Sequence, residues 1–305
     1  MSATTVVRAD KLTKFYGKRR GVEDISFDVG PGEVVGFLGP NGSGKTTVLR
    51  MLMGLISITR GQAGLFGRDI GTSSSSIRAR VGYLPGTLGL YEHLTARQYF
   101  DFLSELRRTD CRNSLTSLCQ RFSLDPELRI KTMSKGTKQK VGLIQAFMHQ
   151  PDLLILDEPT SGLDPLVQHE FEHLLDETRK RGASVILSSH VLSEVEKLAH
   201  RVVILNNGQL LANEPVASLP GHDTREIVLD FEHPVLPADF QNITGFRLLS
   251  CSERRVTGLT TGSQRPLLEA AVRRDVIRIQ SPEPSLDALF RQLVSNSADS
   301  PAGPQ

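Results

Sequence analysis

The chain has 305 residues, of which 36 are lysine or arginine and 34 are aspartate or glutamate, so its formal net charge is +2. This length suffices for two domains with their own cores, and so small a charge argues against a surface built for nucleic acid or an anionic membrane. The cysteines have no metal-ligand spacing and are odd in number, which argues against a disulfide framework: Cys111, Cys119 and Cys251. Because the apolar runs are far shorter than the roughly 20 residues of a membrane span, and because no signal-peptide stretch is seen, we expect a chain that stays outside the bilayer in a reducing cytosol.

Up to about residue 220, short apolar runs alternate with helical patterns, which is typical of a parallel sheet with crossover helices. The clearest buried strands are predicted at 33–38 (EVVGFL), 153–156 (LLIL) and 184–187 (SVIL). Other predicted elements are a helix from Asp164 to about 181, a helix over 191–199, and a hairpin of strands 201–206 and 209–212. The hairpin is predicted because Asn207-Gly208 accepts the positive φ angles of a tight turn.

Between about residues 88 and 135 the strand signals disappear and helical periodicity replaces them. Thr95 and Gln98 have the spacing of a capping box. An apolar stripe follows, which we interpret as core: Tyr99, Phe100, Phe102, Leu103 and Leu106. With a second short helix around 115–122, this segment is expected to be a helical insertion in the α/β domain.

After residue 222 the pattern changes to that of a small α+β unit, predicted over 223–295. Its predicted elements are a strand over 225–231, a β-hairpin within 246–259, a helix over 266–274, a strand over 276–279 and a helix over 286–294. The last ten residues, 296–305, are small and polar and are expected to be disordered.

The strongest chemical signal is GPNGSGKT at 39–46, a phosphate-binding loop that follows directly on a predicted strand. Its glycines allow backbone N–H groups to turn toward a phosphate, and the helix that begins there directs its positive dipole end to the same anion. Lys45 is expected to reach the β- and γ-phosphates, Thr46 to bind Mg²⁺ and Thr47 to contact the α-phosphate. The loop residues predicted to bind the nucleotide are Gly39, Pro40, Asn41, Gly42, Ser43, Gly44, Lys45, Thr46 and Thr47.

A second signal is acidic, because the strand predicted at 153–156 ends in Asp157 and Glu158. Adjacent side chains of a strand point to opposite faces, so we expect the two carboxylates to take different tasks. Asp157 is predicted to bind Mg²⁺ through water, and Glu158 to orient and deprotonate the water that attacks the γ-phosphate. Two acidic residues at a strand end are weak evidence alone, but they are strong evidence beside a phosphate-binding loop.

The order of five residues resembles the ATP-binding cassette of ABC transporters: Ser134, Gly136, Glu158, Asp164 and His190. MSKGT at 133–137 occupies the place of the family's signature sequence, usually LSGGQ, and SGLD stands intact at 161–164. The family's switch histidine matches His190, and its adenine-stacking aromatic residue matches Tyr16. GYLP at 82–85 and GLYEHLT at 89–95 are similar to the drug, antibiotic and polysaccharide exporter branch, in which a small accessory domain often follows the cassette.

This resemblance implies a P-loop NTPase fold of the ABC type over residues 5–222: a RecA-like core sheet, a β-subdomain and a helical insertion at about 88–135. It implies an ATPase that uses ATP and Mg²⁺, with Lys45, Glu158 and His190 as catalytic residues. Two cassettes, expected to be copies of one chain, would pair head to tail. One would supply Tyr16 and the phosphate-binding loop, and the other Ser134 and Gly136, with Asp164 at the contact between the two sites.

The resemblance also implies where the chain works and with what. It places the chain at the cytoplasmic face of the cell membrane, with a permease on a separate chain that docks on the helical insertion. It favours export, of a substrate that the sequence does not identify, and it implies no nucleic-acid partner. A role for residues 225–295 in dimer stabilisation or regulation is a hypothesis only.

Two motifs depart from the family pattern. Gly86 stands where the family usually has the glutamine of its Q-loop, so coupling to the permease must be made differently or loosely here. In the signature, Lys135 replaces a glycine and Thr137 a glutamine. The sequence leaves open whether Lys135 points outward or lends charge to a phosphate.

Each of these residues, taken alone, also has a structural explanation. Tyr16 could be a half-exposed aromatic residue, His190 a structural histidine and Ser134 an ordinary helix cap. For the whole chain, the alternative is a non-transport ABC ATPase, either regulatory or linked to nucleic acid. The single cassette and the small net charge argue against a nucleic-acid role, and the intact Lys45 and Glu158 argue against a module that has lost catalysis.

Overall fold

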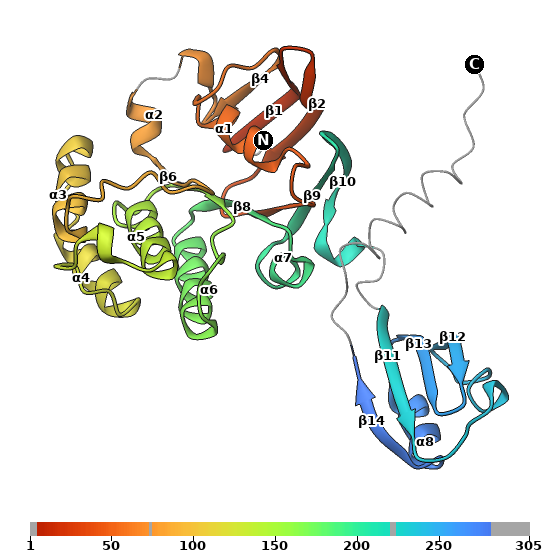
Figure 1. Cartoon of the computed structure of the whole chain (residues 1–305). Coiled ribbons are helices and arrows are strands. Elements are labelled where there is room, and N and C mark those ends of the chain that lie inside the picture. Colours follow the sequence, from red (N-terminus) through yellow and green to blue (C-terminus); the bar gives the residue numbers. More distant parts are fainter. Residues whose placement is uncertain (1–4, 73–74, 220–223, 282–305) are drawn as a thin grey trace, which may run out of the picture. The chain divides into compact units, whose positions relative to one another are not determined.

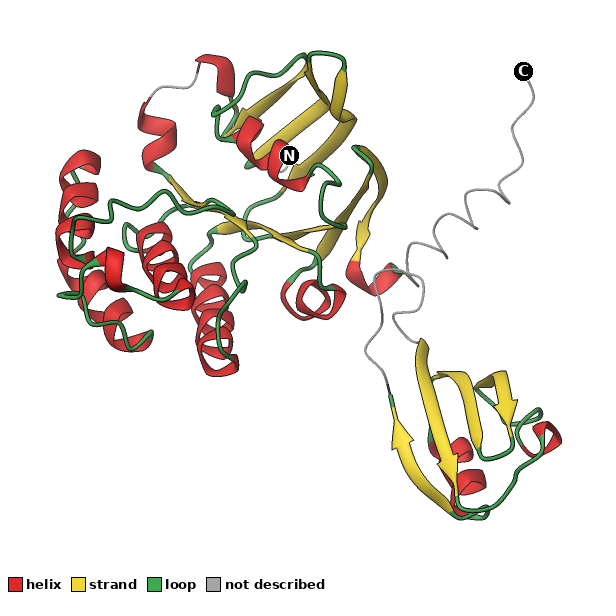
Figure 2. Cartoon of the chain, in the orientation of Figure 1, coloured by secondary structure: helices red, strands yellow, loops and turns green. Residues whose placement is uncertain are grey.

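The computed structural model describes residues 5–72, 75–219 and 224–281 (Figures 1 and 2). Apart from Val191–Ser193, a first compact unit ends at Glu214 and a second begins at Pro215. The predicted domain boundary after residue 222 stays a prediction, because residues 220–223 lie outside the described residues.

The first unit is built on a six-stranded sheet with the order β10-β9-β3-β8-β7-β6. Its strands are β3 (Val34–Leu38), β6 (Val81–Leu84), β7 (Leu153–Asp157), β8 (Ser184–Ser189), β9 (Arg201–Asn206) and β10 (Gln209–Pro215). The neighbours from β9 to β6 pair in parallel, and β3, β7 and β8 are buried along their whole length, as expected for a sheet covered on both faces. The three predicted strands are confirmed. So is the hairpin, in which Asn207 and Gly208 have φ angles of 48° and 76°.

An antiparallel sheet with the order β2-β1-β4-β5 covers one face of the parallel sheet (Figure 2). Its strands are β1 (Val7–Tyr16), β2 (Arg19–Val29), β4 (Arg60–Leu65) and β5 (Arg68–Asp69). The helix α1 (Lys45–Leu52) lies in the core that the two sheets share, where the rings of Phe27 and Phe37 meet edge-on at 5.0 Å. The phosphate-binding loop, which joins β3 to α1, is therefore anchored on both sides by buried elements.

Helices cover the opposite face (Figure 1). They are α5 (Lys135–Phe147), α6 (Pro165–Lys180) and α7 (Leu192–Leu198), while α2 (Ser75–Ala79) precedes β6. The helical insertion contains α3 (Ala96–Arg107) and α4 (Arg112–Arg121). Both predicted caps are confirmed: Thr95 and Gln98 form a capping box at α3, and the Asp164 side chain accepts a hydrogen bond from Val167 N at the start of α6.

The apolar stripe of α3 is core only in part, so its interpretation as core was wrong for two residues. Tyr99 and Phe100 are buried, whereas Phe102 is 42 % and Leu106 70 % exposed. The reason is that α3 lies at the periphery and packs on α5 along one side only. The exposed side instead meets Tyr91, whose ring lies 5.7 Å from that of Phe102.

The second unit has a sheet with the order β12-β13-β11-β14 and one helix, α8 (Arg265–Val272), among its described residues. Its strands are β11 (Thr224–Phe231), β12 (Phe246–Ser252), β13 (Arg255–Thr261) and β14 (Val276–Gln280), all paired antiparallel. A separate core includes Phe231, Phe240 and Leu267. The predicted elements up to 279 are confirmed, and those at 286–294 and 296–305 lie outside the described residues.

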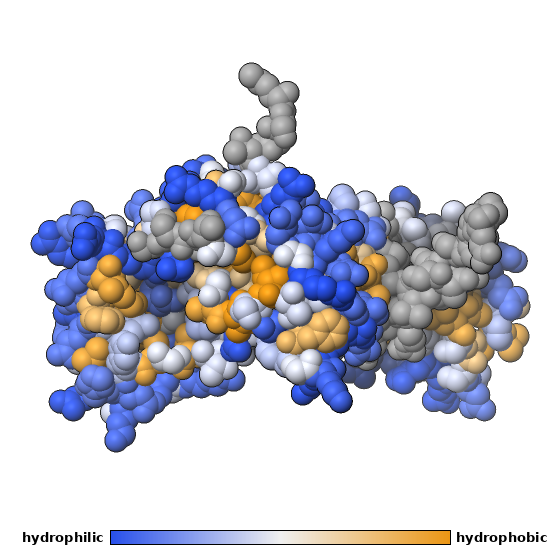
Figure 3. All heavy atoms as spheres, turned by 90° about the horizontal axis from the view of Figure 1, so that it is seen from above, coloured by the Kyte–Doolittle hydropathy of each residue, from blue (hydrophilic) through white to orange (hydrophobic). Residues whose placement is uncertain are grey.

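Over the described part of the chain, no helix is both long and apolar enough to cross a membrane. In the space-filling view, the surface is largely hydrophilic and is interrupted by separate hydrophobic patches (Figure 3).

Candidate nucleotide-binding and catalytic site

A cleft of about 520 Å³ lies over the phosphate-binding loop. It is lined by Tyr16, Arg19, Arg20, Gly21, Asn41, Gly42, Ser43, Gly44, Lys45, Thr46, Thr47, Arg50, Gly86, Thr87, Asp157 and Glu158. Gly42 and Gly44 have φ angles of 82° and 107°, which side chains rarely allow. A Cβ atom at Gly44 would also lie 2.3 Å from the Val22 side chain, so only glycine lets the loop take this shape.

The loop fits an anion. The Lys45 side chain is only 6 % exposed, and its ammonium donates to the carbonyl oxygens of Gly39 and Pro40 at 2.6 and 3.3 Å. Burial lowers the pKa of Lys45, while the nearby charge of Glu158 opposes the shift. The hydroxyl of Ser43 is buried and has no hydrogen-bond partner in the described part of the chain. A buried cation and an unpaired hydroxyl at a helix N-terminus are groups that a phosphate would satisfy.

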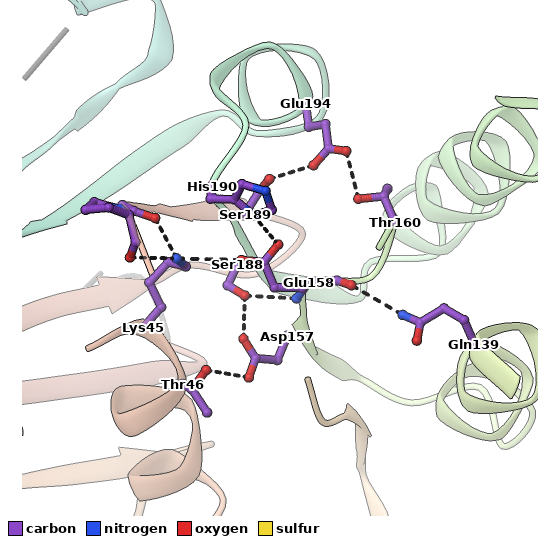
Figure 4. Close-up of polar contacts among 12 residues, drawn as sticks. Lys45, Thr46, Gln139, Asp157, Glu158, Thr160, Ser188, Ser189, His190 and Glu194 are labelled. Atoms are coloured by element: carbon purple, nitrogen blue, oxygen red, sulfur yellow. Dashed lines mark hydrogen bonds and ion pairs between the residues drawn. The ribbon is translucent and has the colours of Figure 1, made fainter. Parts of the chain in front are cut away.

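Hard oxygen donors lie beside the loop. The Thr46 hydroxyl donates to Asp157 Oδ2 at 2.7 Å, and Asp157, which is 1 % exposed, accepts a second bond from Ser188 Oγ at 2.6 Å (Figure 4). A hydroxyl and a carboxylate at this distance fit the oxygen coordination that Mg²⁺ prefers. Gly86 borders the same place, because a Cβ atom there would lie 2.9 Å from Asp157 Oδ2.

Glu158 does not continue the strand. Its φ angle is 52°, so it lies in the left-handed region just after β7 ends. The expectation that Asp157 and Glu158 diverge as neighbours on a strand was therefore wrong: the turn separates them. Left-handed backbone costs a non-glycine residue about 1–2 kcal/mol and tends to occur at functional sites.

The carboxylate of Glu158 lies between two cationic or polar groups. His190 Nδ1 is 2.8 Å from Glu158 Oε2, and Lys45 Nζ is 3.6 Å from Oε1 (Figure 4). The side chain is 22 % exposed and faces the cleft. This arrangement places a carboxylate where it can accept a proton from a water molecule bound beside a phosphate.

Further residues, which the sequence reasoning missed, hold these groups. Ser188 Oγ accepts the Glu158 N–H at 3.0 Å, and Gln139 Nε2 donates to the carbonyl oxygens of Glu158 and Pro159. On the other side, Glu194 accepts hydrogen bonds from Thr160 at 2.8 Å and Ser189 at 2.6 Å. Only Ser188 had a usable signal, since the parallel register that the strands predict places it opposite Asp157.

Tyr16 lies at the rim of the cleft and is 48 % exposed. Its ring covers Gly21, where a Cβ atom would lie 2.9 Å from the ring, and the Lys14 ammonium is 5.4 Å from the ring centroid. A ring in this position can stack on a flat, apolar base.

Gly39 and Pro40, whose carbonyl oxygens accept from Lys45, are not among the residues that line the cleft. Three further predicted binding residues lie away from it. Ser134 caps α5 by accepting a hydrogen bond from Thr137 N, and Asp164 caps α6. Gly136 lies against the SGLD loop, because a Cβ atom there would be 2.8 Å from Gly162 O. The stem of Lys135 covers Gly162 at 3.7 Å from the place of its Cβ. These residues form a second surface, away from the lining of the cleft.

Comparisons with known proteins agree with this geometry. A family model described as "ABC transporter" matches residues 22–161. Over 300 residues the chain is 33 % identical to the bacitracin transport ATP-binding protein BcrA of Bacillus licheniformis, a match that covers 95 % of this chain and 98 % of that protein. The chain belongs to the ATP-binding proteins of ABC transporters. It is also 36 % identical over 230 residues to the Nod factor export ATP-binding protein I of Paraburkholderia xenovorans strain LB400, covering 72 % of this chain and 76 % of that one.

Solved structures confirm the cassette fold of this ABC ATPase. An ATP-binding subunit of an ABC transporter is 31 % identical, with a TM-score of 0.67 over 70 % of this chain and 92 % of that one. A dimeric bacterial ABC transporter cassette matches at 21 % identity with a TM-score of 0.62, over 69 % of this chain and 98 % of that one, and shows the fold alone. The expected family, fold and ATPase activity are confirmed, and part of the chain extends beyond these structural matches.

Proposed function

We propose that this ATPase powers the export of a substrate through a permease on a separate chain. The observation that carries the proposal is the position of Glu158, which is held between His190 and Lys45 at the mouth of the phosphate-binding cleft. A cassette that only bound ATP would not need a carboxylate in this place. Export is supported by two relatives, a bacitracin transport ATP-binding protein and a Nod factor export ATP-binding protein.

In this proposal each residue of the cleft has a separate task. Tyr16 stacks on the adenine, and the loop N–H groups and Lys45 bind the phosphates. Thr46 and Asp157 would hold Mg²⁺, which offsets phosphate charge when bound. Glu158 accepts the proton of the attacking water, and His190 fixes the direction of that carboxylate through its 2.8 Å contact.

The second surface supports a head-to-tail dimer of identical chains. Ser134 and Gly136 lie at the N-terminus of α5, where backbone N–H groups and the helix dipole favour an anion. In the dimer, this end would meet the γ-phosphate of the ATP bound in the other chain's cleft, so ATP would join the two subunits. A related cassette has been solved as a dimer.

The helical insertion supports docking of the permease. Tyr91, Phe102 and Leu106 expose apolar side chains on one patch of it, with Tyr91 and Phe102 in ring contact. Apolar patches of this kind are typical of protein interfaces. Docked there, the ATPase would work as a peripheral protein at the cytoplasmic face of the cell membrane.

The test is the Glu158→Gln variant of the full chain. The amide cannot accept the proton, so we expect ATP turnover to fall by a factor of about 10² or more while ATP still binds and traps a dimer. Turnover at the wild-type rate would show that Glu158 is not the base. For the transport role, a permease should copurify from membranes with the tagged chain; recovery without any membrane protein would favour the non-transport alternative.

A further inference from the structure

The signature helix and the catalytic carboxylate are joined by one buried side chain. Gln139 lies on α5, little more than one turn after Ser134, and is 8 % exposed. Its Nε2 donates to Pro159 O at 3.0 Å and to Glu158 O at 3.3 Å (Figure 4). This amide therefore bridges the two carbonyl oxygens, and it comes from the helix whose first residues form the second surface. Glu158 O also accepts the backbone N–H of Ser161 at 3.2 Å.

The backbone at Glu158 needs such support, because its left-handed conformation is not one that glutamate prefers. Ser188 Oγ accepts the N–H group of this residue, and its C=O group accepts from both Gln139 Nε2 and the backbone N–H of Ser161. The direction of the carboxylate follows from the peptide planes on either side. A shift of Gln139 would therefore turn the carboxylate relative to His190 and the cleft.

The next residues are held from the opposite side. Thr160 Oγ1 donates to Glu194, and the other oxygen of Glu194 accepts from Ser189, which directly precedes His190. Glu194 therefore joins Thr160 to the end of β8, directly before His190, within the same chain. Gln139 is different, because it joins Glu158 and Pro159 to α5, the helix whose first residues form the second surface.

We propose that Gln139 is a positioning residue that couples the N-terminus of α5 to Glu158. When Ser134 and Gly136 bind the ATP of the partner subunit, α5 is held in place. Gln139, on the same helix, then holds the left-handed turn at Glu158. The Glu158 carboxylate is thereby directed at the nucleotide in its own cleft. One cassette then hydrolyses only when the other is loaded. The inference rests on the proposed roles of Glu158 and of the dimer.

The first test is Gln139→Glu in the full chain, measured as ATP turnover against pH. At pH 8 an ionised glutamate has the same shape but presents only acceptors to two carbonyl oxygens, so we expect kcat to fall about tenfold or more with an unchanged Kd for ATP. A protonated carboxyl group can donate again. The ratio of variant to wild-type kcat should therefore rise as the pH is lowered to 6. Unfolding free energies measured at the same pH values separate this rise from a recovery of stability when the buried carboxylate is protonated.

Gln145→Glu is the matched control. Gln145 is also buried on α5, and its Nε2 donates to the backbone carbonyl oxygen of Tyr83 at 2.6 Å. Tyr83 lies on β6 and is not part of the turn at Glu158. The Gln145→Glu variant should lose stability without the pH-dependent loss of kcat. If both variants show the same loss and the same pH profile, the effect belongs to helix stability and the proposal is overturned.

A second variant, Gln139→Met, removes the donor without adding charge and keeps the test open should the glutamate variant fold poorly. Its kcat should fall about tenfold and the Hill coefficient for ATP should approach 1, while ATP-dependent dimers still form in the Glu158→Gln background. Loss of those dimers would mean that Gln139 acts on binding and would overturn the proposal. If Glu158→Gln is inactive but both Gln139 variants keep the wild-type kcat and Hill coefficient, the positioning role of Gln139 fails and the role of Glu158 stands. If Glu158→Gln itself turns over ATP at the wild-type rate, the proposed catalytic role of Glu158 fails.

Discussion

Ser188 donates its hydroxyl to Asp157 Oδ1 at 2.6 Å and accepts the N–H of the next residue, Glu158, at 3.0 Å. The parallel register of β7 and β8, which places Ser188 opposite Asp157, makes both bonds possible. One hydroxyl thus fixes the carboxylate assigned to Mg²⁺ and the backbone of the proposed base. The proposed metal ligand and the proposed base both depend on this hydroxyl, although it touches neither phosphate nor water in the proposal.

We therefore expect Ser188→Ala to impair turnover more than stability. Removing the hydroxyl leaves the N–H of Glu158 unpaired, which costs about 1–3 kcal/mol of unfolding free energy. Ser184→Ala is the control, because Ser184 on the same strand also both donates and accepts, to Gly30 O and from Gly32 N, at the end remote from the cleft. Urea unfolding should give similar losses for the two variants, and only Ser188→Ala should lower kcat strongly. Equal kcat values would contradict the assigned role.

The second prediction concerns Gly86. A Cβ atom there would lie 2.9 Å from Asp157 Oδ2, closer than carbon and oxygen normally approach, so Gly86→Ala should displace the carboxylate or the loop. Overpacking of this kind costs about 1–3 kcal/mol. The Mg²⁺ concentration that gives half-maximal turnover should rise about tenfold. Gly89→Ala is the control, because a Cβ at Gly89 meets nothing within 4 Å. An unchanged Mg²⁺ requirement in Gly86→Ala would show that the site tolerates a side chain.

How far the sequence predicts this molecule depends on how local the interactions are. Thr95 with Gln98, Asp164 with its proline and Asn207-Gly208 each act on backbone groups within a few residues, so the elements they start or join were predicted correctly. The phosphate-binding loop is equally local. Such contacts follow from spacing alone.

Tertiary contacts escaped prediction. Gln139 reaches backbone groups some twenty residues away, and its role depends on how α5 lies beside the turn that follows β7. Glu158 was assigned to a strand because its left-handed φ angle is imposed by the contacts around it, not by glutamate's own preference. Phe102 was taken as core because periodicity gives the apolar face of a helix but not how much of that face a neighbour covers.

The third prediction uses two tyrosines with equal exposure. Tyr16 and Tyr91 are both 48 % exposed, the first at the cleft and the second in the apolar patch of the helical insertion. Tyr16→Ala should weaken ATP binding by about 1–3 kcal/mol, the contribution of stacking on a base, whereas Tyr16→Phe should not. Tyr91→Ala should leave the Kd for ATP unchanged and reduce copurification of the permease. The two effects are measured by nucleotide titration and by pull-down from membranes, and an exchange of the two outcomes would refute both assignments.

The last prediction is a dependence of stability on pH that comes from His149. Burial, and then the charge of Arg107, lowers the pKa of this histidine to about 4. Arg107 Nη1 lies 3.1 Å from His149 Nε2, and the buried Nδ1 has no hydrogen-bond partner within the described residues. Because the folded pKa is below the unfolded value of about 6.5, the unfolded chain binds more protons between these values. The stabilisation that comes from keeping His149 neutral is fully present above about pH 6.5. It is lost as the pH falls toward 4, which lowers the free energy of unfolding by about 3 kcal/mol in total.

His149→Gln removes the titrating group and should flatten this part of the pH profile, at the cost of lower stability at pH 7.5, where a neutral histidine packs well. Urea unfolding at pH 7.5, 6.0 and 4.5 measures the difference between wild type and variant. We expect the difference to shrink as the pH is lowered, because only the wild type takes up a proton at His149 when it unfolds. His93→Gln, at an exposed position, serves as the control and should leave the profile of the wild type unchanged. A constant difference between wild type and His149→Gln across the three pH values would show that His149 does not carry this dependence.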